Sequence, residues 1–213
     1  MAMGLLGKKL GMTRIFDESG VSHPCTVVHV GSNVVTQVKT AEKDGYESVQ
    51  IGYEDVRESR AAKPTIGHCK KAGTAPKRFI REFRGAGDSK PGDVVPLTTF
   101  SVGQFVDVIG ISKGKGFQGV VRRFGQKGQP AAHGSMMHRR TGSIGCRSTP
   151  GRIWKNKQMP GHMGATRITA PNLRVLQIRE EDQVIVIRGA VPGANGSFLV
   201  IREAKKRPAP AKA

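Results

Sequence analysis

A glycine-rich run, Gly114-Lys115-Gly116-Phe117-Gln118-Gly119, follows a strand-like stretch and matches the G-x-G-x-x-G pattern of dinucleotide-binding loops. That fold also needs a parallel βαβ unit and an acidic residue about twenty positions further on, for the ribose hydroxyls. No acid follows until Glu180, so the context does not fit. We expect instead that the glycines let the backbone approach phosphates closely while neighbouring cations neutralise them. Those cations are Lys113, Lys115, Arg122 and Arg123. The alternative is a glycine turn with solvated lysines.

The possible zinc ligands of the same region are His133, His138, Cys146 and His162. Their spacings match no standard zinc module, and the surrounding Lys and Arg disfavour a dication. We expect the histidines to hydrogen-bond to RNA or stack on it, because flat rings among arginines suit unpaired bases. Phe124 and Trp154 fit the same role, although packing of Trp154 beneath the surrounding chain is an equally open alternative. The sequence predicts no metal site.

Carboxylates are the residues on which general acid–base and nucleophilic catalysis depend. Between Val108 and Arg179 there is no Asp or Glu. The acids elsewhere, such as Asp17, Glu18, Glu180, Glu181 and Asp182, fall at predicted turns, where they are ordinary solvated residues. The sequence therefore predicts a protein that is not an enzyme and needs no cofactor.

The charge of the chain is strongly positive and unevenly distributed. Lys and Arg number 35 against 16 Asp and Glu, a formal net charge of +19. Residues 108–179 hold fourteen Lys or Arg and twelve Gly, where about five acids would be expected from the average composition. A polyanionic partner is indicated, and nucleic acid is favoured because the sequence has neither an amphipathic basic helix nor an apolar membrane span.

We call residues 112–169 the arm, because they lack helical or strand periodicity from about Phe124 to Thr166 and hold too few apolar residues for a core. Such a segment is expected to become ordered on its partner. Irregularly spaced cations among Gly, Ser, Thr and Pro suit the phosphates of a folded RNA, whereas DNA readers place contact residues on a helix or ribbon. Further predicted RNA contacts are Lys127, Arg139, Arg140, Arg147, Arg152, Lys155, Lys157 and Arg167, with Lys8, Lys9 and Arg14 near the N-terminus.

Two sets of short β-branched runs separated by turn residues predict antiparallel strands. The first set is Met12–Phe16, Cys25–Val30, Val34–Lys39 and Glu47–Tyr53, and the second is Gln104–Ile111, Leu173–Ile178, Gln183–Arg188 and Ser197–Ile201. Six or more such strands predict a mainly β protein built around a small closed antiparallel barrel. We assign residues 1–59, 91–111 and 170–204 to this body.

A small helical insertion is predicted over residues 60–90, because Thr65–Ala72 and Pro76–Arg84 have helical spacing. In the second of these, Phe79, Ile80 and Phe83 are able to share one face. Residues 205–213 contain two prolines and no large apolar residue, and are predicted to be a disordered tail.

Three cysteines, Cys25, Cys69 and Cys146, are widely spaced and odd in number, which predicts neither a disulfide framework nor a zinc module. The N-terminal apolar run is too short for a signal peptide, so a reducing, cytoplasmic location is expected. Two rivals to an RNA-binding structural protein remain open. One is a free architectural protein that binds duplex DNA, and the other is a nucleotide-dependent enzyme that uses the glycine run.

Several motifs together resemble the bacterial form of universal large-subunit ribosomal protein three, over nearly the whole chain. The opening Gly4–Arg14 is similar to the start of that family, and Phe100–Arg123 fits its signature, including Asp107, Gly110 and Ser112. Other similar segments are His133-Gly134-Ser135, His138-Arg139, Gly142-Ser143-Ile144-Gly145, Thr149-Pro150-Gly151-Arg152, Gly161-His162-Met163-Gly164 and Val191-Pro192-Gly193-Ala194.

The resemblance implies a six-stranded barrel with a small helical insertion, and a long extended arm that runs into large-subunit (23S-type) rRNA toward the peptidyl transferase centre. It also implies early binding near the 3′ end of that rRNA, nucleation of subunit assembly, and contacts with large-subunit proteins fourteen and nineteen. By matching position, the residues nearest the catalytic RNA would be Gly145, Cys146, Arg147, Ser148 and Thr149. Many bacterial members have a glutamine, methylated in some, where this chain has Ser148, so that modification should be absent here.

Overall fold

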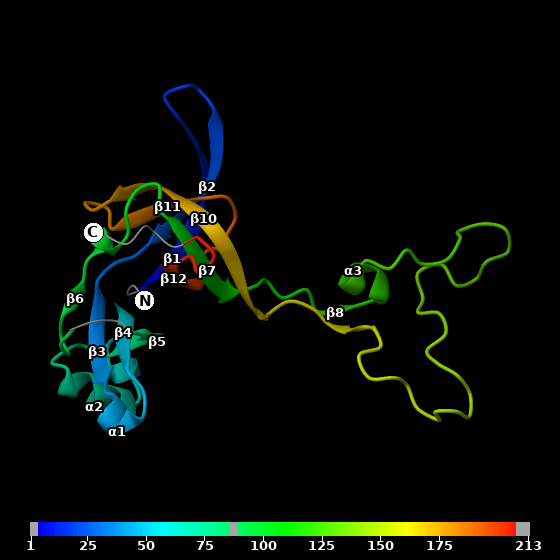
Figure 1. Ribbon diagram of the computed structural model, residues 1–213, viewed down its shortest axis with the longest axis horizontal. Helices are drawn as coiled ribbons and strands as arrows, with labels where there is room; N and C mark the ends of the chain where they lie inside the picture. The colour runs from blue at the N-terminus through cyan, green and yellow to red at the C-terminus, as the bar shows by residue number, and fades with distance from the viewer. Residues whose placement is uncertain (1–3, 86–88, 208–213) are drawn as a thin grey trace. The chain divides into compact units, whose positions relative to one another are not determined.

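The computed structural model describes residues 4–85 and 89–207, which form mainly β structure with few, short helices, as the sequence predicted (Figure 1). The chain divides into two compact units. The first takes the described residues up to Ile111 and from Arg167 onward, and the second is Ser112–Thr166. No helix among the described residues is long and apolar enough to cross a membrane.

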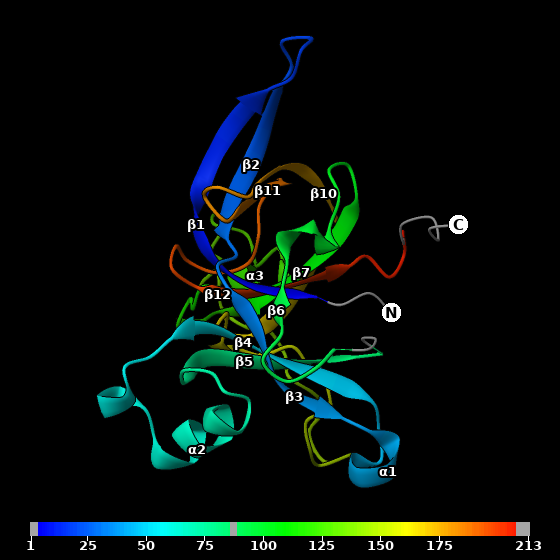
Figure 2. The ribbon, with the colours of Figure 1, turned by 90° about the vertical axis from the view of Figure 1, so that its left-hand side faces the viewer.

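The predicted six-stranded antiparallel sheet is present in the first unit and closes into a barrel, in the order β1-β12-β7-β10-β11-β2. Its strands are β1 (Leu5–Phe16), β2 (Ser22–His29), β7 (Phe105–Ile111), β10 (Arg167–Arg179), β11 (Val184–Arg188) and β12 (Phe198–Glu203). Closure leaves no open sheet edge, because every strand pairs with two neighbours. Beyond the barrel wall, β1 and β2 continue as a long hairpin, seen at the top of Figure 2.

A second sheet, in the order β5-β4-β3-β6, belongs to the same unit. Its strands are β3 (Asn33–Lys39), β4 (Ser48–Asp55), β5 (Lys77–Arg84) and β6 (Val94–Val95), and the connecting helices are α1 (Ala41–Asp44), η1 (Glu58–Arg60), α2 (Lys63–Lys71) and η2 (Leu97–Thr99). The strands expected at Val34–Lys39 and Glu47–Tyr53 therefore exist, but their assignment to the barrel was wrong. They carry the chain into a separate sheet.

The helical prediction for residues 60–90 is half right. Helix α2 covers most of the first predicted range, whereas Pro76–Arg84, predicted as a helix, contains strand β5. Phe79 and Phe83 lie four residues apart, a spacing that puts two side chains on one face of a helix or of a strand. Pairing with β4 makes this segment a strand and not a helix: Phe79 lies opposite Tyr53, and Phe83 lies opposite Val49.

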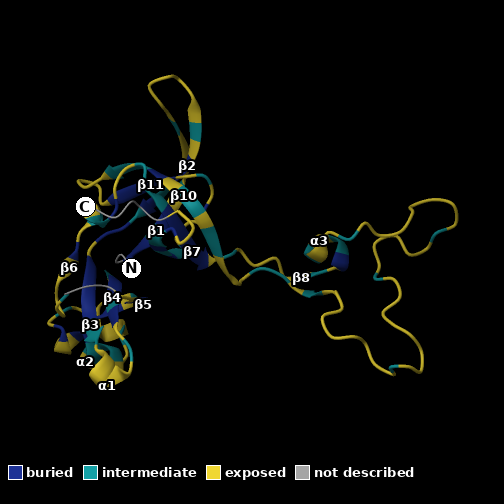
Figure 3. Ribbon diagram, in the orientation of Figure 1, coloured by how far each residue is buried: buried dark blue, intermediate teal, exposed yellow. Residues whose placement is uncertain are grey.

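One hydrophobic core joins the barrel to the second sheet, and buried residues concentrate in these strands (Figure 3). Leu5, Val28, Ile185 and Leu199 from the barrel cluster with residues of the second sheet, such as Ile51. All five side chains are fully buried. Since each such side chain contributes roughly 1.5–3 kcal/mol of burial free energy, this shared core fixes the sheet to the barrel.

The predicted tail begins on the surface of the first unit. The Lys205 N–H donates to a carboxylate oxygen of Asp107 at 3.4 Å, and the Arg207 guanidinium lies 5.1 Å from the centre of the Phe105 ring. These first residues of the predicted disordered tail thus contact barrel residues. Residues 208–213 of the predicted tail lie outside the described residues.

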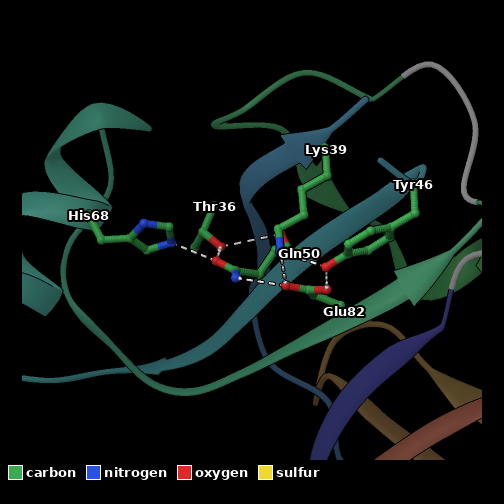
Figure 4. Close-up of polar contacts among 6 residues, drawn as sticks. All are labelled: Thr36, Lys39, Tyr46, Gln50, His68 and Glu82. Atoms are coloured by element: carbon green, nitrogen blue, oxygen red, sulfur yellow. Dashed lines mark hydrogen bonds and ion pairs between the residues drawn. The ribbon is translucent and has the colours of Figure 1, made fainter. Parts of the chain in front are cut away.

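A polar network lies across the second sheet, with contributions from β3, β4, β5 and α2 (Figure 4). The Lys39 ammonium contacts a Glu82 carboxylate oxygen at 2.8 Å and donates to the Tyr46 hydroxyl at 2.7 Å. That hydroxyl donates to the other Glu82 oxygen at 2.8 Å. The Gln50 carbonyl accepts from Thr36 at 2.8 Å and lies 2.5 Å from the His68 ring.

The ion pair in this network makes stability depend on pH. The hydrogen bond from Lys39 holds the pKa of Glu82 below its ordinary value of 4.5, and the same bond raises the pKa of Lys39. A carboxyl whose pKa is depressed by folding stabilises the fold above its unfolded pKa, and this contribution disappears as the pH falls through the folded pKa.

Replacing Glu82 with glutamine is therefore expected to lower the free energy of unfolding by roughly 1 kcal/mol at about pH 7, and to have almost no effect at about pH 3. Urea unfolding at both values checks this. Glu47→Gln is the matched control, since Glu47 is exposed and has no side-chain partner among the described residues. An equal loss at both pH values would contradict the role of the ion pair.

Candidate nucleic-acid interface

The second unit, Ser112–Thr166, begins as two antiparallel segments joined by backbone hydrogen bonds. Its regular elements are β8 (Phe117–Gln118), α3 (Val120–Phe124) and β9 (Gly161–His162). The Lys115 N–H donates to the Met163 carbonyl, and the Met163 N–H donates to the Gly116 carbonyl, each at 2.9 Å. At the end of α3, Arg123 Nη1 donates to the Met159 carbonyl at 2.7 Å. These bonds hold the paired segments together.

Gly164 permits the close approach of these segments. Its φ of +79° lies in the left-handed region, and a Cβ at this position would overlap with the Lys113 carbonyl oxygen. Other residue types are strained by both constraints, since φ is unfavourable and the neighbour is backbone that is unable to move aside.

Gly164→Ala is expected to open the paired segments, raising the amide exchange rates of Lys115 and Met163 roughly tenfold or more. Gly134→Ala is a matched control, because Gly134 has a similar φ of +76° but no atom within 4 Å of the Cβ position. Unchanged amide exchange rates at Lys115 and Met163 in the Gly164 variant would show that a Cβ beside the Lys113 carbonyl does not disturb the pairing of the segments.

From about Gly125 to Gln158 the second unit has no helix or strand. A few hydrogen bonds shape it, such as the one from the Gln129 N–H to the His138 carbonyl at 2.8 Å. Val120 is the only buried residue of the whole unit, every residue of which is described. The unit therefore has no hydrophobic core that could order this loop independently.

Cations dominate the surface of the second unit. It contains eleven Lys and Arg and no Asp or Glu. The exposed residues among the predicted RNA contacts are Lys113, Lys115, Arg122, Lys127, His133, His138, Arg139, Arg140, Arg147, Arg152, Trp154, Lys155, Lys157 and His162. Gly145, Cys146, Ser148 and Thr149, the predicted tip, are also exposed. Arg123 is half-buried and serves the internal bond to Met159.

Predicted contact residues of the first unit have different environments. Arg14, on the β1–β2 hairpin, and Arg167, at the start of β10, are exposed. Lys8 forms an ion pair with Glu54 at 2.9 Å. Lys9 is only 6% exposed, and its ammonium donates to the carbonyls of Val191 and Gly193 at 3.1 and 3.3 Å. The ammonium of Lys9 is thus occupied within the fold, an environment that does not favour the predicted RNA contact.

The environments of the glycine run and of the histidines bear on two alternatives, a dinucleotide-binding loop and a zinc site. Every strand pair among the described residues is antiparallel, so the glycine run has no parallel βαβ unit around it. Within the described ranges, no three His, Cys, Asp or Glu side chains gather as a metal site would require. The side chain of Trp154 is 59% exposed, which does not agree with its packing beneath the arm.

Sequence reasoning left several exposed apolar side chains of this unit without a role. Phe117 is 75% exposed, Met136 85% and Ile153 41%. Their signal was present in the sequence, since large apolar residues in a segment without a core have nothing within it to pack against. Flat or flexible apolar groups between cations are well suited to contact bases once phosphates are neutralised.

Comparisons with known proteins agree on one family. A family model described as ribosomal protein L3 matches residues 89–184. The large ribosomal subunit protein uL3 of Akkermansia muciniphila is 56% identical over 97% of this chain and 100% of its own length. The proteins of that name from Geobacillus stearothermophilus and Streptococcus uberis are 50% and 52% identical, over at least 97% of each chain. The chain belongs to the ribosomal protein L3 family, whose relatives here carry the name uL3.

Proposed function

We propose that this protein is a structural component of the large ribosomal subunit that binds 23S-type rRNA, in the cytoplasm, as part of the ribosome. One observation carries the proposal: the second unit exposes nearly all of its eleven Lys and Arg, holds no carboxylate and has no core of its own. A segment of this kind gains its order from a polyanion, because RNA phosphates supply the charge that the chain lacks.

The proposed mechanism is electrostatic and makes or breaks no bond. The arm, residues 112–169, follows the RNA backbone with its Lys and Arg, while its glycines permit close approach to phosphates. Exposed rings such as Trp154 and Phe117 stack on unpaired bases. Positively charged RNA-binding segments need neither a catalytic carboxylate nor a metal, and we propose no enzymatic activity, cofactor, small-molecule substrate or membrane partner.

The finer assignment rests on the family resemblance. We propose that the protein binds early, near the 3′ end of the large rRNA, and nucleates subunit assembly. The residues from Gly145 to Thr149 would then approach the peptidyl transferase centre, and large-subunit proteins fourteen and nineteen would be its protein neighbours. All five residues of that tip are exposed in the second unit and so are accessible to RNA.

Binding of the full-length protein to transcribed large-subunit rRNA, with duplex DNA of equal phosphate content as competitor, tests the proposal. We expect the rRNA to be strongly preferred at physiological salt, since the arm matches a folded RNA and not a groove of regular duplex. Comparable binding to the duplex would favour a free architectural nucleic-acid-binding protein instead.

Arg147→Ala is expected to change peptidyl transfer or sensitivity to antibiotics that bind near that centre, while subunit incorporation stays close to that of the unaltered protein. The reason is that one arginine among many supplies a small share of the total binding free energy. Peptide-release assays and the amount of protein in purified subunits measure the two effects. Arg139→Ala is the control for loss of one arm charge away from the tip; a large loss of incorporation on changing Arg147 alone would contradict the assignment.

A further inference from the structure

A basic hollow of about 640 Å³ lies in the first unit, in the region that joins the end of β4 to α2 and the start of β5. Four cationic side chains line it, against a single carboxylate. The cations are Arg57, Arg60, Lys77 and Arg78, and the carboxylate is that of Asp55. The hollow is formed by elements of the second sheet and is not part of the arm.

The carboxylate is already engaged. Lys77 Nζ lies 2.5 Å from Asp55 Oδ1, and the Lys77 side chain is only 4% exposed. Asp55 and Lys77 are register partners on β4 and β5, so sheet pairing fixes this contact in the wall. The negative charge of Asp55 is thereby matched by Lys77, and the lining contains no further carboxylate for the three arginines.

The arginines themselves are largely available. Arg57 and Arg60 are exposed, and neither side chain forms an ion pair or hydrogen bond within the described part of the chain. Arg57 is the N-cap residue of η1 and Arg60 ends that helix, so one short turn brings both residues to the lining of the hollow. The Arg78 side chain is 62% exposed, and its guanidinium lies 3.8 Å from a carboxylate oxygen of Glu54. Glu54 forms a shorter ion pair with Lys8, at 2.9 Å. Two exposed guanidinium groups in one hollow, neither with an ion-pair partner among the described residues, favour an anionic ligand.

The polarity of the surrounding backbone adds to this charge. The hollow is also lined by Ala62 and Thr65, at the beginning of α2. Ala62 is the N-cap and supplies no side-chain cap, and the first turn contains no acidic residue. The positive end of the helix dipole therefore reinforces the arginines, although Pro64 in the first turn has no N–H to donate.

We propose that this hollow binds backbone phosphodiester groups of RNA, and so forms a second RNA contact, separate from the arm. The proposal rests on the proposed function, since it assigns a particular surface of the first unit to the same RNA. No aromatic side chain lines the hollow, so its cations suit phosphate and no aromatic ring is present on which a base would stack. Arg57 and Arg60 each form a charge-assisted contact with a phosphate oxygen, and Lys77 with Asp55 maintains the wall.

The test compares the full-length Arg57→Gln/Arg60→Gln variant with the unaltered protein in binding to transcribed large-subunit rRNA over a range of salt concentrations. We expect binding roughly tenfold weaker at physiological salt. The slope of the logarithm of affinity against that of salt concentration should fall in magnitude by between about 1 and 2. Lys70→Gln/Lys71→Gln removes equal charge from exposed positions of α2 that do not line the hollow, and should alter both quantities much less.

A charge-preserving variant separates loss of contact from loss of folding. Arg57→Lys/Arg60→Lys should restore the salt slope, because each lysine still neutralises a phosphate. Equal effects of the hollow and control variants would overturn the inference, as would normal rRNA binding by the glutamine variant. If that variant binds rRNA normally but enters subunits poorly, an acidic protein segment occupies the hollow, and the RNA assignment is wrong. Failure of the unaltered protein to bind rRNA would instead refute the proposed function itself.

Discussion

Replacing Arg139, Arg140, Arg147 and Arg152 together with glutamine is expected to weaken binding of the full-length protein to large-subunit rRNA by on the order of 100-fold or more. All four residues are exposed on the loop of the second unit, where no carboxylate is present to pair with them. Each lost phosphate contact removes one counter-ion from those released on binding, so the salt slope should fall in magnitude by about 3. Binding titrations over a range of salt concentrations measure both effects.

Thermal stability of that variant should be unchanged, because none of the four side chains packs in the core of the first unit. The control is the set of four Arg→Lys substitutions, which keeps the charge and should retain the salt slope while losing bidentate phosphate contacts. A glutamine variant with an unaltered salt slope would mean that these arginines do not contact phosphates. The arm would then need another role.

The largest expected effect on stability follows from Asn33→Ala, with the free energy of unfolding lowered by about 3 kcal/mol. Asn33 is fully buried at the start of β3. Its Oδ1 accepts from the Leu6 N–H at 2.9 Å, and its Nδ2 donates to the carbonyls of Leu6, Val30 and Gly31 at 3.0 to 3.1 Å. Alanine leaves these groups buried without a partner, where the chain passes from the barrel into the second sheet.

Urea unfolding of the full-length protein measures this loss. Asn195→Ala is the control, since Asn195 is exposed and makes no side-chain hydrogen bond among the described residues; its effect should stay within about 0.5 kcal/mol. An equally small loss of unfolding free energy in Asn33→Ala would show that water or neighbouring groups replace the hydrogen bonds of the Asn33 amide. The junction would then depend on its apolar contacts alone.

The strands could be predicted from the sequence, but their partners could not. Runs such as Val34–Lys39 show β-branched residues between turns, a local signal that says nothing about which sheet accepts the strand. Phe79 and Phe83 satisfy both helical and strand periodicities, so only the pairing of β5 with β4 excludes the helix. Long-range pairing therefore decided both points at which the predicted architecture was wrong.

Composition indicated the exposure of the cations in the second unit, but not the burial of Lys9 in the barrel. The acid-free stretch around Arg139 and Arg147 has no carboxylate or core to bury a cation, so its side chains are exposed, as composition indicated. Lys9 lies in a strand with a register shift between Lys9 and Gly11, and its ammonium turns inward to the Val191 and Gly193 carbonyls. Such a contact is not visible in the composition, because the partners of the ammonium are backbone atoms distant in sequence. The hollow at Arg57 and Arg60 depends on tertiary folding for the same reason.

The most direct test asks whether this protein is an integral rRNA-binding component of the large ribosomal subunit. A cell lysate is sedimented through sucrose gradients at low and then at high salt, and this protein is followed across the fractions. We expect the protein to travel with the large subunit under both conditions, because contacts embedded in folded rRNA resist salt that releases peripheral electrostatic binders. Absence from the ribosomal fractions, or release from the large subunit at high salt, would contradict an integral place in the subunit.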